Sequence, residues 1–218
     1  MPGPTLIIRQ CLNLQCRFRF PAPATGSAGR FCPRCGWETE IITASRPGVQ
    51  TRSLSAMPSG PVVEALLDNI RSTFNVGSIF RASDGAGLRR LHLCGVTPTP
   101  ENPKVAKTAL GAESSLEWVY HLNAVHAARE LKNQGMRVCA LEIIPGSCSI
   151  FEAAAHMGSS PLLLVVGNEV TGVDPELIDL SDVVFSIPMQ GHKESLNVSL
   201  AFGIAAYALR FAPNINKA

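Results

Sequence analysis

Apolar and polar residues alternate in blocks along the chain after residue 60. Five short apolar runs have the length of buried strands and cover residues 62–67, 91–96, 138–144, 162–166 and 183–187. Amphipathic or alanine-rich stretches of helical length cover residues 76–86, 124–133 and 195–211. Strands that alternate with helices in this way predict βα units around a mainly parallel sheet. We therefore expect an α/β fold for this part of the chain.

The last stretch, residues 195–211, is apolar around nearly its whole helical circumference. Its apolar side chains are Leu196, Val198, Leu200, Phe202, Ile204, Tyr207 and Leu209. A helix without a polar face has to be buried on more than one side. We expect the sheet or a second subunit to cover it.

The apolar pattern is lost between residues 44 and 60, where Ser, Pro and Gly are frequent. Such a composition is typical of a linker. With 218 residues the chain has room for one sizeable core and a small appendage. The expected organisation is a small module at 1–43, a linker at 44–60 and the main domain at 61–218.

Composition indicates a compact globular protein, because 46% of the residues are hydrophobic and 17% are charged. No stretch approaches the roughly 20 apolar residues that cross a bilayer. The first residues lack the charged start and the long apolar run of a secretory signal. We expect a cytoplasmic protein that does not contact a membrane.

Charge is unevenly distributed, although the net charge is only +2. Residues 1–60 hold two acidic residues and seven arginines, which are Arg9, Arg17, Arg19, Arg30, Arg34, Arg46 and Arg52. The first 60 residues therefore carry +5 and the remainder −3. This asymmetry predicts that the N-terminal module contacts a polyanion, and arginine suits phosphate contacts and base stacking. The alternative is a module that is basic for solubility alone.

Four of the seven cysteines fall within the first 35 residues, spaced as Cys11-x4-Cys16-x15-Cys32-x2-Cys35. Two thiolate pairs joined by a loop of this length can converge on one tetrahedral zinc ion. A module this small buries too little apolar surface to fold alone, so zinc would supply most of its folding free energy. Disulfides are the alternative, which the expected cytoplasmic location disfavours. The other three cysteines are interpreted as packing residues: Cys94, Cys139 and Cys148.

A first polar segment joins a strand to a helix at residues 68–87. Asn75 lies at the expected helix start, where its side chain can cap free N–H groups. Arg81 lies six positions later among apolar neighbours that place it close to the core side, where a guanidinium needs an anionic partner. Arg81 is therefore the stronger candidate for a functional role.

Two further polar segments follow later strands. The strand at 162–166 ends in Gly167, Asn168 and Glu169, and ligands of open α/β sheets collect beyond such carboxyl ends. A plain turn is the alternative. After the strand at 183–187, Ser195 is a candidate N-cap of the last helix, whereas Asn197 inside its first turn suggests a second task.

These three segments, in this order and spacing, resemble the three motifs of the SpoU/TrmH family of RNA ribose 2′-O-methyltransferases, in the SPOUT class. They read DNIRSTFNVGSIFRASDGAG at 68–87, LLLVVGNEVTGVDPELIDLSD at 162–182 and SIPMQGHKESLNVSLAFGIAAYAL at 186–209. The resemblance covers about residues 60–212 and includes NPKVAKTALGAESS at 102–115. It implies a C-terminal trefoil knot, S-adenosylmethionine bent into that knot, and a homodimer with the final helix near its interface.

The resemblance also implies roles for individual residues. Matched position by position, the polar pairs and the acid of the motifs fall on Asn75, Arg81, Glu169, Ser195 and Asn197. Backbone groups around the cofactor fall near Gly167, Ile187, Met189 and Leu196. Because a guanidinium has a pKa of about 12 or higher, it is a poor base. We interpret Arg81 as gripping an RNA phosphate and stabilising the developing alkoxide.

The expected activity is S-adenosylmethionine-dependent 2′-O-methylation of a structured RNA, either tRNA or rRNA. The N-terminal module is a candidate reader of that RNA. Its aromatic residues either stack on bases or form the minimal core of the module, and they are Phe18, Phe20, Phe31 and Trp37. The alternative function is a non-catalytic RNA-binding protein that keeps the fold, against which the five polar motif residues argue.

Overall fold

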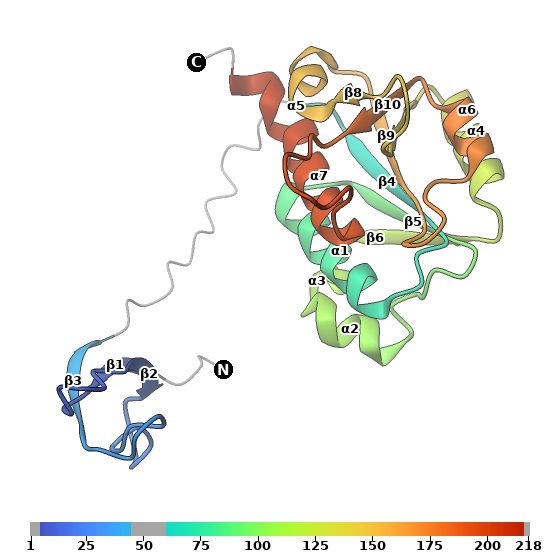
Figure 1. The fold of residues 1–218 in the computed structure, drawn as a ribbon. Helices are drawn as coiled ribbons and strands as arrows, with labels where there is room; N and C mark the ends of the chain where they lie inside the picture. The colour runs from blue at the N-terminus through green and yellow to red at the C-terminus, as the bar shows by residue number, and fades with distance from the viewer. Residues whose placement is uncertain (1–4, 45–59, 216–218) are drawn as a thin grey trace. The chain divides into compact units, whose positions relative to one another are not determined.

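A computed structural model describes residues 5–44 and 60–215 of the chain. Contacts divide the chain into two compact units, Met1–Ala56 and Met57–Ala218. The expected linker at 44–60 falls almost entirely outside the described residues. Each unit is described by itself (Figure 1).

The first unit is a three-stranded antiparallel sheet in the order β2-β1-β3. Its strands are β1 (Leu6–Cys11), β2 (Arg19–Pro23) and β3 (Thr39–Ala44). Its buried hydrophobic side chains are few and small: Ile7, Cys11, Ala22 and Cys32. So little buried apolar surface is not enough to hold a module of this size together.

The second unit is a seven-stranded sheet in the order β6-β5-β4-β9-β7-β10-β8, and every adjacent pair is parallel. The strands are β4 (Val63–Asp68), β5 (Arg90–Cys94), β6 (Glu117–His121), β7 (Arg137–Leu141), β8 (Cys148–Ser149), β9 (Leu162–Val166) and β10 (Val183–Ser186). The α/β prediction with a mainly parallel sheet is confirmed.

Helices cover both faces of this sheet (Figure 1). One face carries α1 (Thr73–Ala86) and α7 (Val198–Ile215), and the other carries α4 (Ala124–Asn133) and α6 (Pro175–Leu180). Two short helices, α2 (Pro103–Ala109) and α3 (Ala112–Ser115), pack against α1. A short helix α5 (Ile150–Ala153) and the 3-10 turn η1 (Ala154–His156) contact α7.

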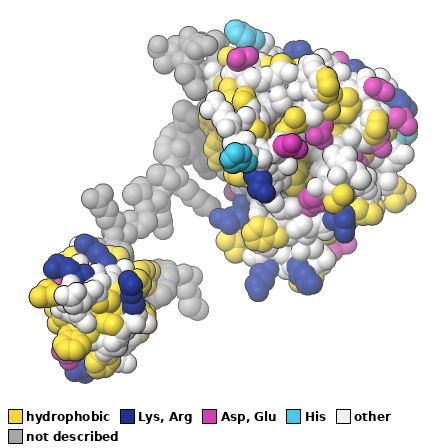
Figure 2. Space-filling view, in the orientation of Figure 1, with side chains coloured by type: hydrophobic (Ala, Val, Ile, Leu, Met, Phe, Trp, Pro, Cys, Tyr) yellow, Lys and Arg dark blue, Asp and Glu magenta, His cyan; other side chains and the backbone are white. Residues whose placement is uncertain are grey.

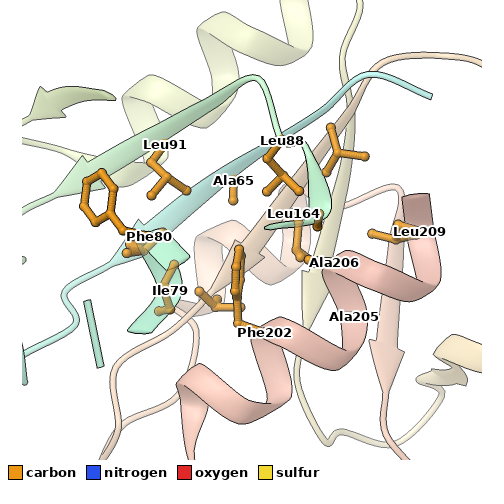
Figure 3. Packing of buried hydrophobic residues seen from close by; sticks show 14 of the residues in the cluster. Ala65, Ile79, Phe80, Leu88, Leu91, Leu164, Phe202, Ala205, Ala206 and Leu209 are labelled. Carbon is orange, nitrogen blue, oxygen red and sulfur yellow. The ribbon is translucent and has the colours of Figure 1, made fainter. Parts of the chain in front are cut away.

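Alternate residues of the central strands build two cores, one on each face. Figure 3 shows the larger one, where Ala65 of β4 and Leu164 of β9 meet Phe80 of α1 and Phe202 of α7. The smaller core lies under α4 and α6, and its buried residues include Leu66, Val138, Leu163, Ala128 and Leu177. A sheet buried on both faces explains why its central strands read as mainly apolar runs rather than as an alternation of apolar and polar residues.

Most of the expected elements lie within three residues of their predicted positions, and the segments 124–133 and 162–166 coincide with α4 and β9. The final helix starts at Val198 rather than at Ser195. Strand β6 was not predicted, because it is a half-exposed edge strand with polar ends. The trefoil knot stays a prediction. No helix among the described residues is long and apolar enough to cross a bilayer.

Candidate functional site

A cavity of about 520 Å³ opens at the carboxyl ends of β7, β9 and β10. It is lined by residues 141–143, 166–170, 172, 186–187, 189, 195–198 and 201. The lining includes all four residues expected near the cofactor, which are Gly167, Ile187, Met189 and Leu196. Glu169, Ser195 and Asn197 line it too, so segments that are distant in the chain meet here.

The loop after β9 is fixed by close backbone packing. A Cβ atom added to Gly167 would lie 2.2 Å from the backbone of Gly172, so no larger residue fits there. The Asn168 side chain accepts hydrogen bonds from the Val170 and Thr171 amides at 2.8 and 3.2 Å. The same side chain donates to the Asn69 carbonyl at 2.6 Å. The wall of the cavity is therefore a rigid turn, as the turn interpretation of this segment expected, and it also presents Glu169.

Glu169 ties this turn to the start of α1. Its carboxylate accepts hydrogen bonds from the Arg71 amide at 2.9 Å, the Ser72 amide at 3.0 Å and the Asn75 side chain at 2.9 Å. Burial tends to raise the pKa of Glu169, but these hydrogen bonds outweigh it and hold the pKa below its usual value. The carboxylate is therefore charged at neutral pH.

Asn75 and Asn197 extend the connection to the start of α7. The Asn197 amide donates to the Asn75 side-chain oxygen at 3.1 Å, and Asn75 is buried. The Asn197 oxygen accepts from the Ser199 amide at 2.9 Å, so Asn197 caps α7. The expected cap, Ser195, lies before the helix and is exposed.

The predicted capping role of Asn75 is wrong. Ser72 caps α1 by accepting a hydrogen bond from the Asn75 backbone amide at 3.3 Å. This leaves the Asn75 side chain free to bridge Glu169 and Asn197. Ser72 and Asn75 are both good capping residues, and the sequence alone does not say where the first helical turn starts.

Arg81 is not where the sequence interpretation put it. It is exposed, it does not line the cavity, and its side chain has no hydrogen bond or ion pair with any residue in the described parts of the chain. Six residues of helix turn its side chain by about 120° from that of Asn75 and displace it by about 9 Å along the axis. The expectation of an anionic partner near the core is therefore contradicted.

The four N-terminal cysteines converge in the first unit. Their sulfur atoms all lie within 4.8 Å of one another, with 3.5 Å between those of Cys11 and Cys35 and 3.9 Å between those of Cys16 and Cys32. Four thiolates around zinc are about 3.8 Å apart, because each Zn–S bond is about 2.3 Å long. A disulfide needs about 2.05 Å. The sulfur positions therefore fit a tetrahedral metal site.

The sequence interpretation missed Glu142, which follows β7 and lines the cavity. Its Oε2 atom accepts a hydrogen bond from the Val173 amide at 2.9 Å. The sequence does contain a sign of this role, because Glu142 is an acidic residue inside the apolar run at 138–144. The prediction assigned the whole run to a strand. The strand in fact ends at Leu141.

Comparison with known proteins gives relatives that act on RNA. The chain is 34% identical over 144 residues to a tRNA (guanosine(18)-2′-O)-methyltransferase of Aquifex aeolicus, covering 64% of each protein. It is 30% identical over 173 residues to the 23S rRNA (guanosine(2553)-2′-O)-methyltransferase RlmP of Bacillus subtilis, covering 78% of this chain and 68% of that protein. The chain thus spans only about two thirds of the length of these relatives.

Solved structures show the same fold. An AdoMet-bound rRNA methyltransferase from Sinorhizobium meliloti matches with a TM-score of 0.64 and 27% identity, over 72% of this chain and 58% of that one. The A. aeolicus TrmH/SpoU tRNA modifying enzyme matches with a TM-score of 0.62 and 28% identity, over 73% and 80%. Residues 63–207 match the model of the SpoU rRNA Methylase family, and the chain belongs to that family.

Proposed function

We propose that this chain transfers the methyl group of S-adenosylmethionine to a ribose 2′-hydroxyl of tRNA or rRNA. The observation that carries the proposal is the hydrogen-bonded chain of Glu169, Asn75 and Asn197, which joins three distant segments beside one cavity. Family membership and relatives named as tRNA and rRNA 2′-O-methyltransferases support this reaction class. Such substrates agree with the expected cytoplasmic location.

The cavity fits S-adenosylmethionine in size and in chemistry. Pockets for ligands of this size have volumes of about 300–1,000 Å³. Apolar side chains of Val166, Ile187 and Leu196 would contact the adenine, and backbone groups at the ends of β9 and β10 would bind its polar edge. When bound, S-adenosylmethionine supplies a methyl group activated by a sulfonium. An AdoMet-bound neighbour with the same fold supports this assignment.

The residues beside the cavity would act mainly by positioning. Glu169, Asn75 and Asn197 hold the turn after β9, the start of α1 and the start of α7 in one arrangement. A preformed site saves the reorganisation that would otherwise add to the barrier, and orientation supplies up to about 7–11 kcal/mol in favourable cases. Ser195 lies at the same wall, where its hydroxyl can contact cofactor or ribose.

Replacing Glu169 tests this positioning role. In Glu169→Gln an NH₂ group takes the place of one acceptor oxygen and faces backbone N–H donors, so kcat/KM should fall about 10- to 100-fold. The assay measures labelled methyl transfer from S-adenosylmethionine to tRNA and to rRNA fragments. Glu152→Gln on α5 is the matched control, because Glu152 is exposed and outside the cavity. Equal activity of the two variants would reject the role.

A homodimer would bring Arg81 to a cavity, and we include it in the proposal. The side of α7 away from the sheet exposes Leu200 at 55% and Tyr207 at 46%, which a second copy would cover. The first turn of α7 borders the cavity, so a copy packed on α7 would lie next to it. Arg81 lies one helical turn from Gly85, where an added Cβ atom would lie 2.7 Å from the Tyr207 hydroxyl, and is thus beside the same surface.

Mixing two inactive variants tests whether Arg81 acts in the partner's site. Arg81→Ala and Asn197→Ala should each be nearly inactive. After subunit exchange, half of the dimers contain one intact site, which restores about a quarter of wild-type activity if Arg81 acts across the interface. No restoration, with exchange verified by mass spectrometry, would assign Arg81 to its own subunit. There it would grip an RNA phosphate and stabilise the developing alkoxide.

Zinc is the metal that the four cysteines would hold. The thiolate set, the sulfur separations and the near absence of a hydrophobic core in this unit all support a structural zinc site. Such a site closes all four coordination positions with protein ligands. We therefore assign zinc a role in folding and none in methyl transfer.

The first unit, residues 5–44, called the zinc module from here on, would bind the RNA substrate. Phe31 and Trp37 are 56% and 58% exposed, which is too open for core residues and favours base stacking. The Arg30 guanidinium lies 5.7 Å from the centre of the Phe31 ring. Figure 2 shows hydrophobic and basic side chains side by side on the visible face of this unit. This mixture suits unpaired nucleotides, which offer both phosphates and open bases.

A further inference from the structure

Glu142 is held rigidly against the cavity wall. Its Oε2 accepts a hydrogen bond from the Val173 amide and its Oε1 accepts one from the Ile143 amide, both at 2.9 Å. Gly172, with φ +74°, lies directly on this carboxylate, since an added Cβ would come within 2.5 Å of Oε2. Glu142 therefore presents a fixed negative charge rather than a mobile surface side chain.

The charge of the cavity is one-sided. Among the described residues that line it, the charged ones are Glu142 and Glu169, and none is basic. Neither carboxylate forms a salt bridge with any residue in ranges 5–44 and 60–215. His192 and Lys193, in the loop between Met189 and Ser195, are exposed and outside the lining.

The two carboxylates differ in how many of their hydrogen-bond acceptor sites are occupied. Glu169 accepts three N–H donors and is committed to joining the segments of the site. Glu142 accepts two, and a carboxylate has about four acceptor sites. Glu142 thus retains free acceptor capacity and an unneutralised charge at a wall of the cavity.

We propose that Glu142 makes this cavity select for a positively charged cofactor, so that S-adenosylmethionine binds more tightly than the product S-adenosylhomocysteine. The inference rests on the proposed methyltransferase function. S-Adenosylmethionine carries a sulfonium, an ammonium and a carboxylate, a net charge of +1, whereas loss of the methyl group leaves a neutral thioether. A fixed carboxylate in a partly closed site attracts the cation more strongly than the neutral product. Transfer itself would then weaken cofactor binding and favour product release.

Calorimetric titration of the full chain with three ligands tests this selectivity. They are S-adenosylmethionine, S-adenosylhomocysteine and sinefungin, which carries an amine cation near the position of the sulfonium. We expect the wild type to bind the two cationic ligands more tightly than S-adenosylhomocysteine. In Glu142→Gln their affinity should fall about tenfold, which is about 1.4 kcal/mol, while that of S-adenosylhomocysteine changes less than about twofold. Glu152→Gln should leave all three affinities unchanged.

The possible outcomes separate this inference from the proposed function. Equal weakening of all three ligands in Glu142→Gln would mean that Glu142 only holds the turn after β9, and would overturn the inference. If that variant does not fold, Glu142→Asp and the wild-type preference for sinefungin over S-adenosylhomocysteine decide, and equal wild-type affinities for these two would overturn it. A wild type that binds none of the three would reject the proposed function itself, whereas binding without charge selectivity rejects only this inference.

Discussion

The two units of this chain differ in how much hydrophobic core they contain. The unit at 60–215 buries a parallel sheet between two layers of helices, and its cores hold most of the buried hydrophobic residues. The unit at 5–44 buries four small hydrophobic side chains and gathers four thiols instead. Two of its aromatic side chains, Phe31 and Trp37, are 56% and 58% exposed. A module that buries so little apolar surface can expose residues that a hydrophobic core would otherwise bury.

Metal removal should have the largest effect and should separate the two units. Structural zinc contributes about 10–16 kcal/mol in zinc-finger peptides. After chelation, backbone amides of residues 5–44 should lose protection from hydrogen exchange. Those of the second unit, residues 60–215, called the sheet unit from here on, should keep theirs. Cys32→Ser should act like the chelator, and Cys148→Ser in the sheet unit is the control. Protection that persists in the metal-free module would contradict this account.

Shortening a buried side chain should destabilise the second unit, which depends on its hydrophobic core. Leu164 lies in the central strand β9 and is fully buried, so Leu164→Ala should lower the free energy of unfolding of the sheet unit by about 2–5 kcal/mol. Leu122→Ala is the control, because Leu122 is 86% exposed and should cost less than about 0.5 kcal/mol. Urea unfolding measures both. A similar loss for the two variants would mean that the core assignment is wrong.

Removing one exposed aromatic side chain should affect RNA and leave the cofactor alone. Trp37→Ala should weaken RNA binding by about 1–3 kcal/mol, the usual contribution of one stacked base. Fluorescence anisotropy with a labelled tRNA transcript gives the affinity, and calorimetry with S-adenosylmethionine gives the cofactor affinity. Ile42→Ala, on β3, is the matched apolar control. Unchanged RNA affinity would leave the module with a structural role.

A buried hydrogen-bond network should make the stability of the sheet unit depend on pH. The Glu64 carboxylate, fully buried in β4, contacts Arg89 and the His92 Nε2 atom, the latter at 2.7 Å. The His92 Nδ1 atom lies 2.9 Å from Nε2 of His121. In this arrangement neutral His92 donates to Glu64 and accepts from His121. Burial lowers the pKa of His92, against the opposing effect of Glu64.

The sign of the pH effect follows from this lowered pKa. Below a pH of about 6.5 the unfolded chain binds a proton at His92 more readily than the folded chain does. The stabilisation is therefore present above about pH 6.5 and declines as the pH falls, by about 1.4 kcal/mol for each unit of pKa shift. Urea unfolding at pH 7.5 and 5.5 measures it, with His126→Gln as the exposed control and His92→Gln as the variant. A sheet unit that is equally stable at both pH values would exclude this effect.

The sequence predicted the fold better than it predicted the geometry of the site. Five of the seven strands of the sheet are visible as apolar runs because both of their faces are buried. Strand β6 was missed because it lies at the sheet edge and exposes Val119 and Tyr120. Residue types alone identified Glu169 and Asn197, but not that Asn75 connects them. That connection depends on contacts between residues 94 and 122 positions apart, which local periodicity does not encode.

Arg81 and Glu142 are two residues whose positions relative to the cavity the sequence did not predict. The apolar neighbours of Arg81 suggested a buried side chain, yet the rotation of α1 turns it to the surface. Glu142 lies in an apolar run that was predicted to be a strand as far as residue 144, yet it lines the cavity because β7 already ends at Leu141. A shift of a few residues at a strand end, or of a fraction of a turn in a helix, decides whether a side chain reaches the cavity.

One measurement tests the central claim most directly. The protein is incubated with unmodified tRNA and rRNA transcripts and with S-adenosylmethionine that carries a deuterated methyl group, and the RNA is then digested and analysed by mass spectrometry. The account predicts one nucleoside with the labelled methyl on its ribose oxygen, and a strong loss of this product with Asn197→Ala. Label on a base, or no label on any RNA while the wild type still binds S-adenosylmethionine, would contradict it.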